Sequence, residues 1–264
     1  MFCAGILVLL VLAAIFAPVI APYDPTYQDY SAVLAAPSMA HPFGTDEYGR
    51  DILSRIIYGS RVSISIGIVA QVVASFVGVI LGAVAGYYGG RIDSIISRIM
   101  EIFQAFPDLI FAMAIMTFLG KGVLNLFIAL GLLTWVRTAR MIRGSVMQLK
   151  EKEYIEASRA CGASTFWIIT KGLIPNCLST IIVLVTLGIP NAIMYEASLS
   201  FLGIGIQPPT PSWGNLMELA RNTEVFQDFP WNWLPAGIMC LLTVISINLI
   251  GEGLRDAFDP KDIR

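Results

Sequence analysis

Two carboxylates inside long apolar runs are the residues of this chain best placed to do chemistry. Asp108 follows Pro107 in the run 99–120, and Glu196 comes directly after the uncharged run 172–195. A carboxylate that faces lipid is costly, so such a residue normally faces a path for solutes or a neighbouring helix. We predict that Asp108 and Glu196 line such a path. Hydrogen bonding between helices is the alternative interpretation of both positions.

Motifs of hydrolytic enzymes are missing from the sequence. The only histidine, His41, is in a proline-flanked loop, which argues against a Ser-His pair and against a histidine metal site. Gly120-Lys121 is the one Gly-Lys step, but a nucleotide-binding loop would need glycine in place of Ile115 and serine or threonine in place of Gly122. We therefore expect that the chain is not an enzyme, and we predict no catalytic residue, metal site or cofactor site in it.

The composition indicates a membrane protein. Hydrophobic residues make up 56% of the 264 residues and charged residues 14%, whereas about 25% of a soluble domain is charged. The formal net charge of -2 gives no attraction to a phosphate backbone, so no nucleic acid is expected as a partner. The expected surrounding is the lipid bilayer.

Six apolar segments predict an all-α, polytopic membrane protein with six spanning helices in a single domain, 1–264. A bilayer core of about 30 Å is crossed by about 20 helical residues. The expected spans are residues 1–23, 62–88, 92–119, 122–140, 176–197 and 230–251. The segments between them are an external loop at 24–61, a cytoplasmic loop at 141–175, an external loop at 198–229 and a cytoplasmic tail at 252–264.

The distribution of basic residues predicts the orientation of these spans. With a cytoplasmic N-terminus, 12 of the 17 Lys and Arg residues fall on the cytoplasmic side, and the other five are Arg50, Arg55, Arg61, Lys121 and Arg221. The opposite topology would invert that ratio. We therefore expect both termini in the cytoplasm, with the first span retained rather than cleaved.

The first external loop contains an amphipathic segment. Apolar residues recur at helical spacing between Thr45 and Gly59, and most positions of the opposite face are charged. We predict a helix that lies on the outer membrane surface, with Thr45 as its N-cap.

The longest cytoplasmic loop offers a surface suited to a protein partner. Residues 137–171 hold seven basic residues, and the run 153–163 predicts a helix of small side chains that ends at Gly162. Small side chains let the backbone of a partner come close, and glycine permits a sharp turn. A second short helix is expected at 164–171. The alternative interpretation is an amphipathic loop that lies on the membrane.

This loop resembles a known signature. Glu156-Ala157-Ser158, followed by Gly162 and by Ile174-Pro175, is similar to the EAA signature of permease subunits in bacterial binding-protein-dependent ABC importers. Ser158 stands in place of the usual second alanine. The resemblance implies that an ATPase-coupling site is formed by Glu156, Ala157, Ser158, Arg159, Gly162, Ala163 and Pro175.

Further motifs extend the resemblance over nearly the whole chain. An external motif of the dipeptide, oligopeptide and nickel branch is similar to Gly44, Thr45, Asp46, Gly49, Arg50 and Asp51. Segments 86–93, 196–214 and 254–260 resemble other motifs of that branch, in the expected order. The chain therefore resembles the second, "C"-type permease of the pair that these importers contain.

The resemblance implies a type I ABC importer permease fold and a set of partners. These are a second homologous permease, two cytoplasmic ATPases that bind ATP and Mg, and an extracytoplasmic solute-binding protein. The chain would form half of a translocation path for di- or oligopeptides in the bacterial cytoplasmic membrane. Nickel or another small solute is the alternative substrate, and an ion-coupled secondary transporter or a structural membrane protein is the alternative class.

Overall fold

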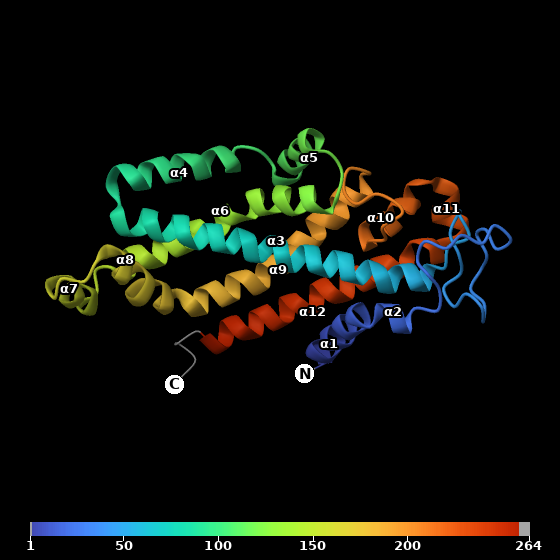
Figure 1. The fold of residues 1–264 in the computed structure, drawn as a ribbon, viewed down its shortest axis with the longest axis horizontal. Coiled ribbons are helices and arrows are strands. Elements are labelled where there is room, and N and C mark those ends of the chain that lie inside the picture. Colours follow the sequence, from blue (N-terminus) through green and yellow to red (C-terminus); the bar gives the residue numbers. More distant parts are fainter. Residues whose placement is uncertain (1, 259–264) are drawn as a thin grey trace.

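Helices make up most of the structure, a computed structural model that describes residues 2–258 (Figure 1). No β-strand element occurs in this part of the chain. The α-helices are α1 (Phe2–Ile15), α2 (Ala17–Ile20), α3 (Ile52–Tyr88), α4 (Gly90–Gln104), α5 (Asp108–Leu119), α6 (Val123–Leu149), α7 (Glu153–Ala160), α8 (Thr165–Trp167), α9 (Leu178–Phe201), α10 (Trp213–Glu218), α11 (Thr223–Asp228) and α12 (Leu234–Phe258). Shorter π- and 3-10-helical turns are Ile168–Leu173, Ile174–Cys177, Leu219–Arg221 and Pro230–Asn232.

The expected apolar segments are all helical, but not all of them are single long spans. By length and composition, four helices can cross a membrane: α3, α6, Thr165–Phe201 and α12. The bent pair α4 and α5 is a fifth candidate. The first expected span, 1–23, is divided at Phe16 into α1 and α2, so its longest apolar helix is shorter than predicted. The count of six spans is therefore approximate.

The predicted amphipathic helix is not a separate element. It is the first part of α3, which runs for 37 residues from the outer loop into the second expected span. Asp51, not Thr45, is the N-cap, because its carboxylate accepts a 2.8 Å hydrogen bond from the Ser54 amide. Ile52 and Ile56 are buried against Leu216 and Ala236, so this apolar face packs on protein rather than on lipid.

The third expected span is broken sharply. Helices α4 and α5 meet at 89° across residues 105–107, where one spanning helix at 92–119 was predicted. Pro107 supplies no backbone N–H and disfavours the helical conformation of the residue before it, so the helix ends there and restarts at Asp108. Asp108 is consequently the first residue of α5, where the helix dipole favours a negative charge.

Glycines bring α3 and α6 into close contact. Gly78, Gly82 and Gly86 recur every four residues on the side of α3 that faces α6. A Cβ on Gly82 would lie 2.4 Å from the Ala139 carbonyl oxygen, and one on Gly78 would lie 2.7 Å from that of Trp135. Helices in lipid gain little from hydrophobic burial, so close van der Waals approach at small residues stabilises their packing. None of the predicted motifs includes this pattern, although its four-residue spacing is visible in the sequence.

Both helices beside the cytoplasmic loop are longer than predicted. Helix α6 was expected to end at 140 but continues to Leu149, so the arginines assigned to the loop lie on a helix. One of them, Arg143, donates two hydrogen bonds to Asp93 on α4, at 2.5 and 2.6 Å. The helix expected at 164–171 and the span expected at 176–197 form one long segment, Thr165–Phe201, because the π- and 3-10-helical turns pass through Pro175 without ending it.

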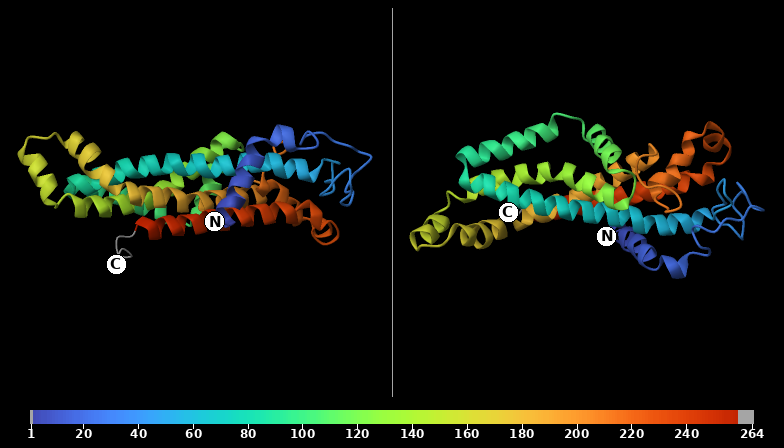
Figure 2. Two further views of the ribbon diagram at one scale, coloured as in Figure 1. Left: turned by 90° about the horizontal axis from the view of Figure 1, so that it is seen from below. Right: turned by 45° about the horizontal axis from the view of Figure 1, so that its top comes forward.

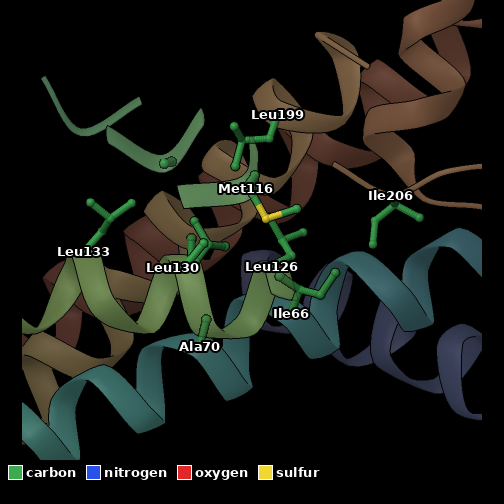
Figure 3. Packing of buried hydrophobic residues seen from close by; sticks show 11 residues of the cluster. Ile66, Ala70, Met116, Leu126, Leu130, Leu133, Leu199 and Ile206 are labelled. Carbon is green, nitrogen blue, oxygen red and sulfur yellow. The ribbon is translucent and has the colours of Figure 1, made fainter. Parts of the chain in front are cut away.

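The main apolar core lies where α3, α5, α6 and α9 meet (Figure 3). Met116 of α5, Leu126 and Leu130 of α6, and Leu199 of α9 are almost fully buried there. The elongated bundle has two distinct ends (Figure 2): α7 and α8 lie at one, and residues 24–51 with α10 and α11 at the other. These two ends therefore lie on opposite sides of the main apolar core.

Candidate functional site

Helix α7 is fixed to the bundle by one face. Ile155 is fully buried in a cluster with Ile142 and Val146 of α6, Ala83 of α3, and Leu173. On the same helix, the Arg159 guanidinium lies 5.7 Å from the centre of the Tyr87 ring. Helix α7 is thus packed against α3 and α6 at this end of the bundle.

The segment 156–163, which follows Ile155, is largely open. Glu156, Ala157, Arg159 and Gly162 are exposed, whereas Ser158 and Ala163 are half-buried. A shallow hollow of about 560 Å³ lies beside them and is lined by Ala157, Ser158, Cys161, Gly162, Ala163, Ser164 and Trp167. Pro175 does not line this hollow: it lies in the 3-10-helical turn that leads into α9. The structure therefore brings residues 156–163 together and leaves Pro175 apart from them.

The backbone conformation at position 162 favours glycine. Its φ is +83°, a region that L-residues rarely adopt, and its N–H donates to the Arg159 carbonyl oxygen. A Cβ at this position would find no atom within 4 Å. The cost of a substitution within this chain is consequently backbone strain rather than a collision.

Asp108 lines a cavity on the side of the bundle between α5, α6 and α9. Its Oδ2 accepts a 2.6 Å hydrogen bond from the Tyr195 hydroxyl of α9. The cavity measures about 190 Å³, and its polar lining consists of Gln71, Gln104, Asp108, Thr134, Arg137, Thr138, Asn191 and Tyr195. The structure therefore groups Asp108 with polar side chains from five helices.

A second cavity of about 410 Å³ adjoins the first. The two share Arg137, Leu184 and Leu187, and the second extends to Arg255 and Phe258 near the end of α12. Sequence reasoning missed Gln71, Arg137, Asn191 and Tyr195. Polar residues within the predicted spans were the available signal for Gln71 and Asn191, and Arg137 had been counted only as a basic residue on the cytoplasmic side.

Glu196 lies elsewhere, in a fully buried hydrogen-bond network. Its carboxylate accepts from the Ser63 hydroxyl at 2.8 Å and from the Ser200 hydroxyl at 2.9 Å. Ser63 Oγ in turn accepts from the Trp213 amide at 3.1 Å. The network joins α3, α9 and α10, and Glu196 lines neither cavity. This geometry matches the alternative interpretation, hydrogen bonding between helices.

The external motif forms a folded scaffold over the start of α3. The Asp46 carboxylate accepts from Arg50 Nε at 2.7 Å and from the amides of Tyr48 and Arg50. The Thr45 hydroxyl accepts from the Ala35 amide at 2.8 Å. Both residues are fully buried, so the motif fixes the loop that precedes α3.

Tight turns and a second carboxylate complete this scaffold. Gly44 and Gly49 both have φ of +71°, and a Cβ on Gly49 would lie 1.9 Å from the Asp29 carbonyl oxygen. Asp51 Oδ1 lies 3.0 Å from Nδ1 of His41, which gives the only histidine a structural partner.

A bundle of apolar helices with polar-lined cavities, an outer scaffold and an exposed loop at the other end defines a polytopic membrane transport protein. Residues 78–263 match the family described as binding-protein-dependent transport system inner membrane component, and residues 1–37 match the N-terminal TM domain of oligopeptide transport permease C. The chain belongs to the first of these families: it is the permease subunit of an ABC importer, and not the ATPase.

Curated relatives cover nearly the whole chain. The oligopeptide transport system permease protein OppC of Bacillus subtilis (strain 168) is 42% identical over 257 residues, 97% of this chain and 83% of that protein. The dipeptide transport system permease protein DppC of the same strain is 42% identical over 260 residues, 98% of this chain and 81% of that protein. The di/tripeptide transport system permease protein DppC of Pseudomonas aeruginosa (strain UCBPP-PA14) is 41% identical over 263 residues, 97% of this chain and 86% of that protein.

A solved structure has the same fold. A chain of the MetNI methionine ABC transporter in an inward-facing conformation superposes with a TM-score of 0.61, covering 78% of this chain and 97% of that chain. Their sequence identity is 19%, so the likeness concerns the fold alone. The predicted all-α, type I importer permease fold is confirmed.

Proposed function

We propose that the chain forms half of the translocation path of an ATP-driven importer for di- or oligopeptides. Peptide permease is the role printed in the names of the relatives that cover nearly the whole chain. The observation that carries the path is the adjoining pair of cavities, which share Arg137, Leu184 and Leu187 and extend from Tyr195 to Arg255. Nickel or another small solute is the alternative cargo.

The second permease and the two ATPases complete the path and drive it. The second permease closes the open side of the cavities, and an extracytoplasmic binding protein delivers the peptide to the end of the bundle that carries the scaffold. The ATPases bind ATP and Mg in the cytoplasm, and the chain itself holds no cofactor. Both termini lie in the cytoplasm, as the distribution of basic residues favours.

The hollow beside α7 is the binding site of an ATPase. Ala157, Ser158 and Gly162 give this surface its small side chains, and Glu156 offers a charge to a basic group on the partner. Ile155 couples a movement of the ATPase to the bundle, because it is buried among residues of α3 and α6 and close to the start of α9. A displacement of α7 would therefore move the helices that line the cavities.

Reconstitution tests this function. The chain is purified with its partner permease and ATPases, placed in proteoliposomes and supplied with binding protein, and uptake of labelled di-, tri- and longer peptides is measured with and without ATP. We expect ATP-dependent uptake of peptides. Uptake of nickel but of no peptide would replace the substrate, and peptide uptake driven by an ion gradient without ATP would contradict the mechanism.

A further inference from the structure

Three arginines follow one another along α6 at intervals of three residues, and one of them has no partner among residues 2–258. Arg143 is paired with Asp93 of α4. Arg140 donates to the Gln104 side chain at the end of the same helix. Arg137 makes neither an ion pair nor a hydrogen bond within the part of the chain that the structure describes. It is nevertheless the charged one of the three residues that line both cavities.

Arg137 is exposed, and its side chain lies against the two cavities. It lies close to the middle of α6, a helix of 27 residues that is long and apolar enough to cross a membrane. An arginine within an apolar helix of this kind normally faces water, an ionic partner or a solute rather than lipid. The cavity walls offer this guanidinium neutral polar side chains, but they bring no carboxylate within ion-pair distance of it.

Asp108 supplies the opposite charge in the same cavity. It accepts a hydrogen bond from Tyr195, which orients the carboxylate without neutralising it. The Asp108 oxygens lie more than 4.0 Å from the Arg137 nitrogens, which is too far for an ion pair. Neither charge is therefore neutralised by the other. One cavity therefore presents a cation and an anion that are both available to a ligand.

We propose that this cavity recognises the two charged ends of a zwitterionic peptide during its passage. Arg137 binds the terminal carboxylate, and Asp108, held by Tyr195, binds the terminal ammonium group. The inference rests on the proposed function, since it concerns the peptide that the importer carries. A guanidinium forms two parallel hydrogen bonds with a carboxylate, which gives geometric selection as well as attraction.

The dimensions and the remaining lining suit such a ligand. An extended dipeptide is about 7 Å long, and ligand pockets commonly measure about 300–1,000 Å³. The two adjoining cavities, of about 190 and 410 Å³, fall in this range together. Gln71, Thr134 and Asn191 present amide and hydroxyl groups that can bond to the peptide unit of any sequence. Contacts to the ends and the backbone select peptides as a class, whatever their side chains.

A second cation continues the site inward. Arg255 of α12 lines the inner cavity together with Arg137 and is also without an ion pair among residues 2–258. A carboxylate that leaves Arg137 therefore meets another guanidinium in the next cavity. This order of charges favours passage with the carboxyl end leading.

The experiment compares a free peptide with its C-terminal amide in the complete reconstituted importer. Preloaded binding protein is supplied at saturating concentration, and its loaded fraction is measured for each peptide, so that delivery is equal. Uptake rates are measured for the wild type, Arg137→Gln, Arg137→Lys and the control Arg98→Gln. Arg98 pairs with Glu101 on the exposed side of α4 and lines neither cavity. Stimulation of ATP hydrolysis by loaded binding protein reports whether each complex is assembled.

We expect Arg137→Gln to slow uptake of the free peptide about tenfold and to leave uptake of the amide at its already lower wild-type rate. Arg137→Lys should restore part of the rate, since it keeps the charge without the planar fork. Equal slowing of both peptides would assign Arg137 a structural role, and an unchanged rate for the free peptide would remove it from the path. Either result overturns the inference, whereas ATP-dependent peptide uptake by the wild type upholds the proposed function.

Discussion

The Tyr195 hydroxyl of α9 donates a 2.6 Å hydrogen bond to Oδ2 of Asp108, the first residue of α5. This contact ties the broken third span to the helix that continues from the cytoplasmic loop. We expect Asp108→Leu to lower uptake at least several-fold while the complex still assembles, because the charge that faces the cavity is removed. Uptake in proteoliposomes and co-purification of the ATPases measure the two effects separately.

Tyr195→Phe separates orientation from charge. It keeps the ring and the Asp108 carboxylate but removes the hydrogen bond, so uptake should fall by less than with Asp108→Leu. Normal uptake by Asp108→Leu would show that the carboxylate is incidental to transport. Ser65→Ala is a suitable control, because this exposed hydroxyl bonds only within α3.

A second prediction concerns the turn after α7. Gly162→Val should abolish uptake and release or uncouple the ATPases, because φ of +83° strains a β-branched residue by about 1–3 kcal/mol and the side chain protrudes into the hollow. Gly162→Asn should retain more activity, since asparagine tolerates this conformation better than other L-residues. Uptake and ATPase co-purification are measured for both variants.

Gly144→Ala is the matched control for this turn. Gly144 lies inside α6, where a Cβ would meet no atom within 4 Å and the backbone is helical. Alanine there should be neutral or should stabilise the helix by about 0.5–1 kcal/mol. If Gly162→Val imports peptide normally with both ATPases bound, the coupling role assigned to residues 156–163 is wrong.

The sequence predicts where the chain is helical more reliably than where the helices bend or join. Apolar runs of about 20 residues leave little choice in lipid, where every backbone group must be bonded within the helix. The 89° break before Asp108 depends in addition on how α5 packs against α6 and α9. The union of the outer amphipathic segment with α3 likewise depends on Leu216 and Ala236, which lie far along the chain.

The candidate site was predictable only in part for a related reason. Residues 156–163 form a local surface, and a local pattern of small side chains is enough to suggest it. The cavity joins Gln71, Asp108, Arg137 and Tyr195 from four helices, and no spacing in the sequence relates them. The roles of Asp108 and Glu196 also differ by burial, since Glu196 is enclosed by serines while Asp108 is exposed, and burial follows from packing.

A third prediction concerns the close packing of α3 on α6. Gly82→Ala should destabilise the protein by about 1–3 kcal/mol, because the added Cβ would lie 2.4 Å from the Ala139 carbonyl oxygen. Gly131→Ala is the control: a Cβ there would lie at 3.6 Å from Val73, an ordinary contact. The thermal unfolding temperature of the two purified variants in detergent compares them. Equal stability of Gly82→Ala and the wild type would contradict the close approach of these helices.

The orientation of the chain in the membrane is the last prediction, and a native thiol offers a probe for it. Cys161 is exposed beside the α7 hollow, whereas Cys177 and Cys240 are buried. In a Cys3→Ser background, Cys161 should resist a membrane-impermeant thiol reagent in intact cells and react after permeabilisation, because the basic residues place this loop in the cytoplasm.

A second thiol on the opposite side completes this test. Thr210 is exposed in the loop between α9 and α10, at the end of the bundle that also carries the external scaffold. In a background in which Cys3 and Cys161 are both replaced by serine, Thr210→Cys should react in intact cells without permeabilisation. Labelling of Cys161 together with protection of the thiol at position 210 would reverse the proposed topology, and it would also place the hollow beside α7 on the side that no cytoplasmic ATPase can reach.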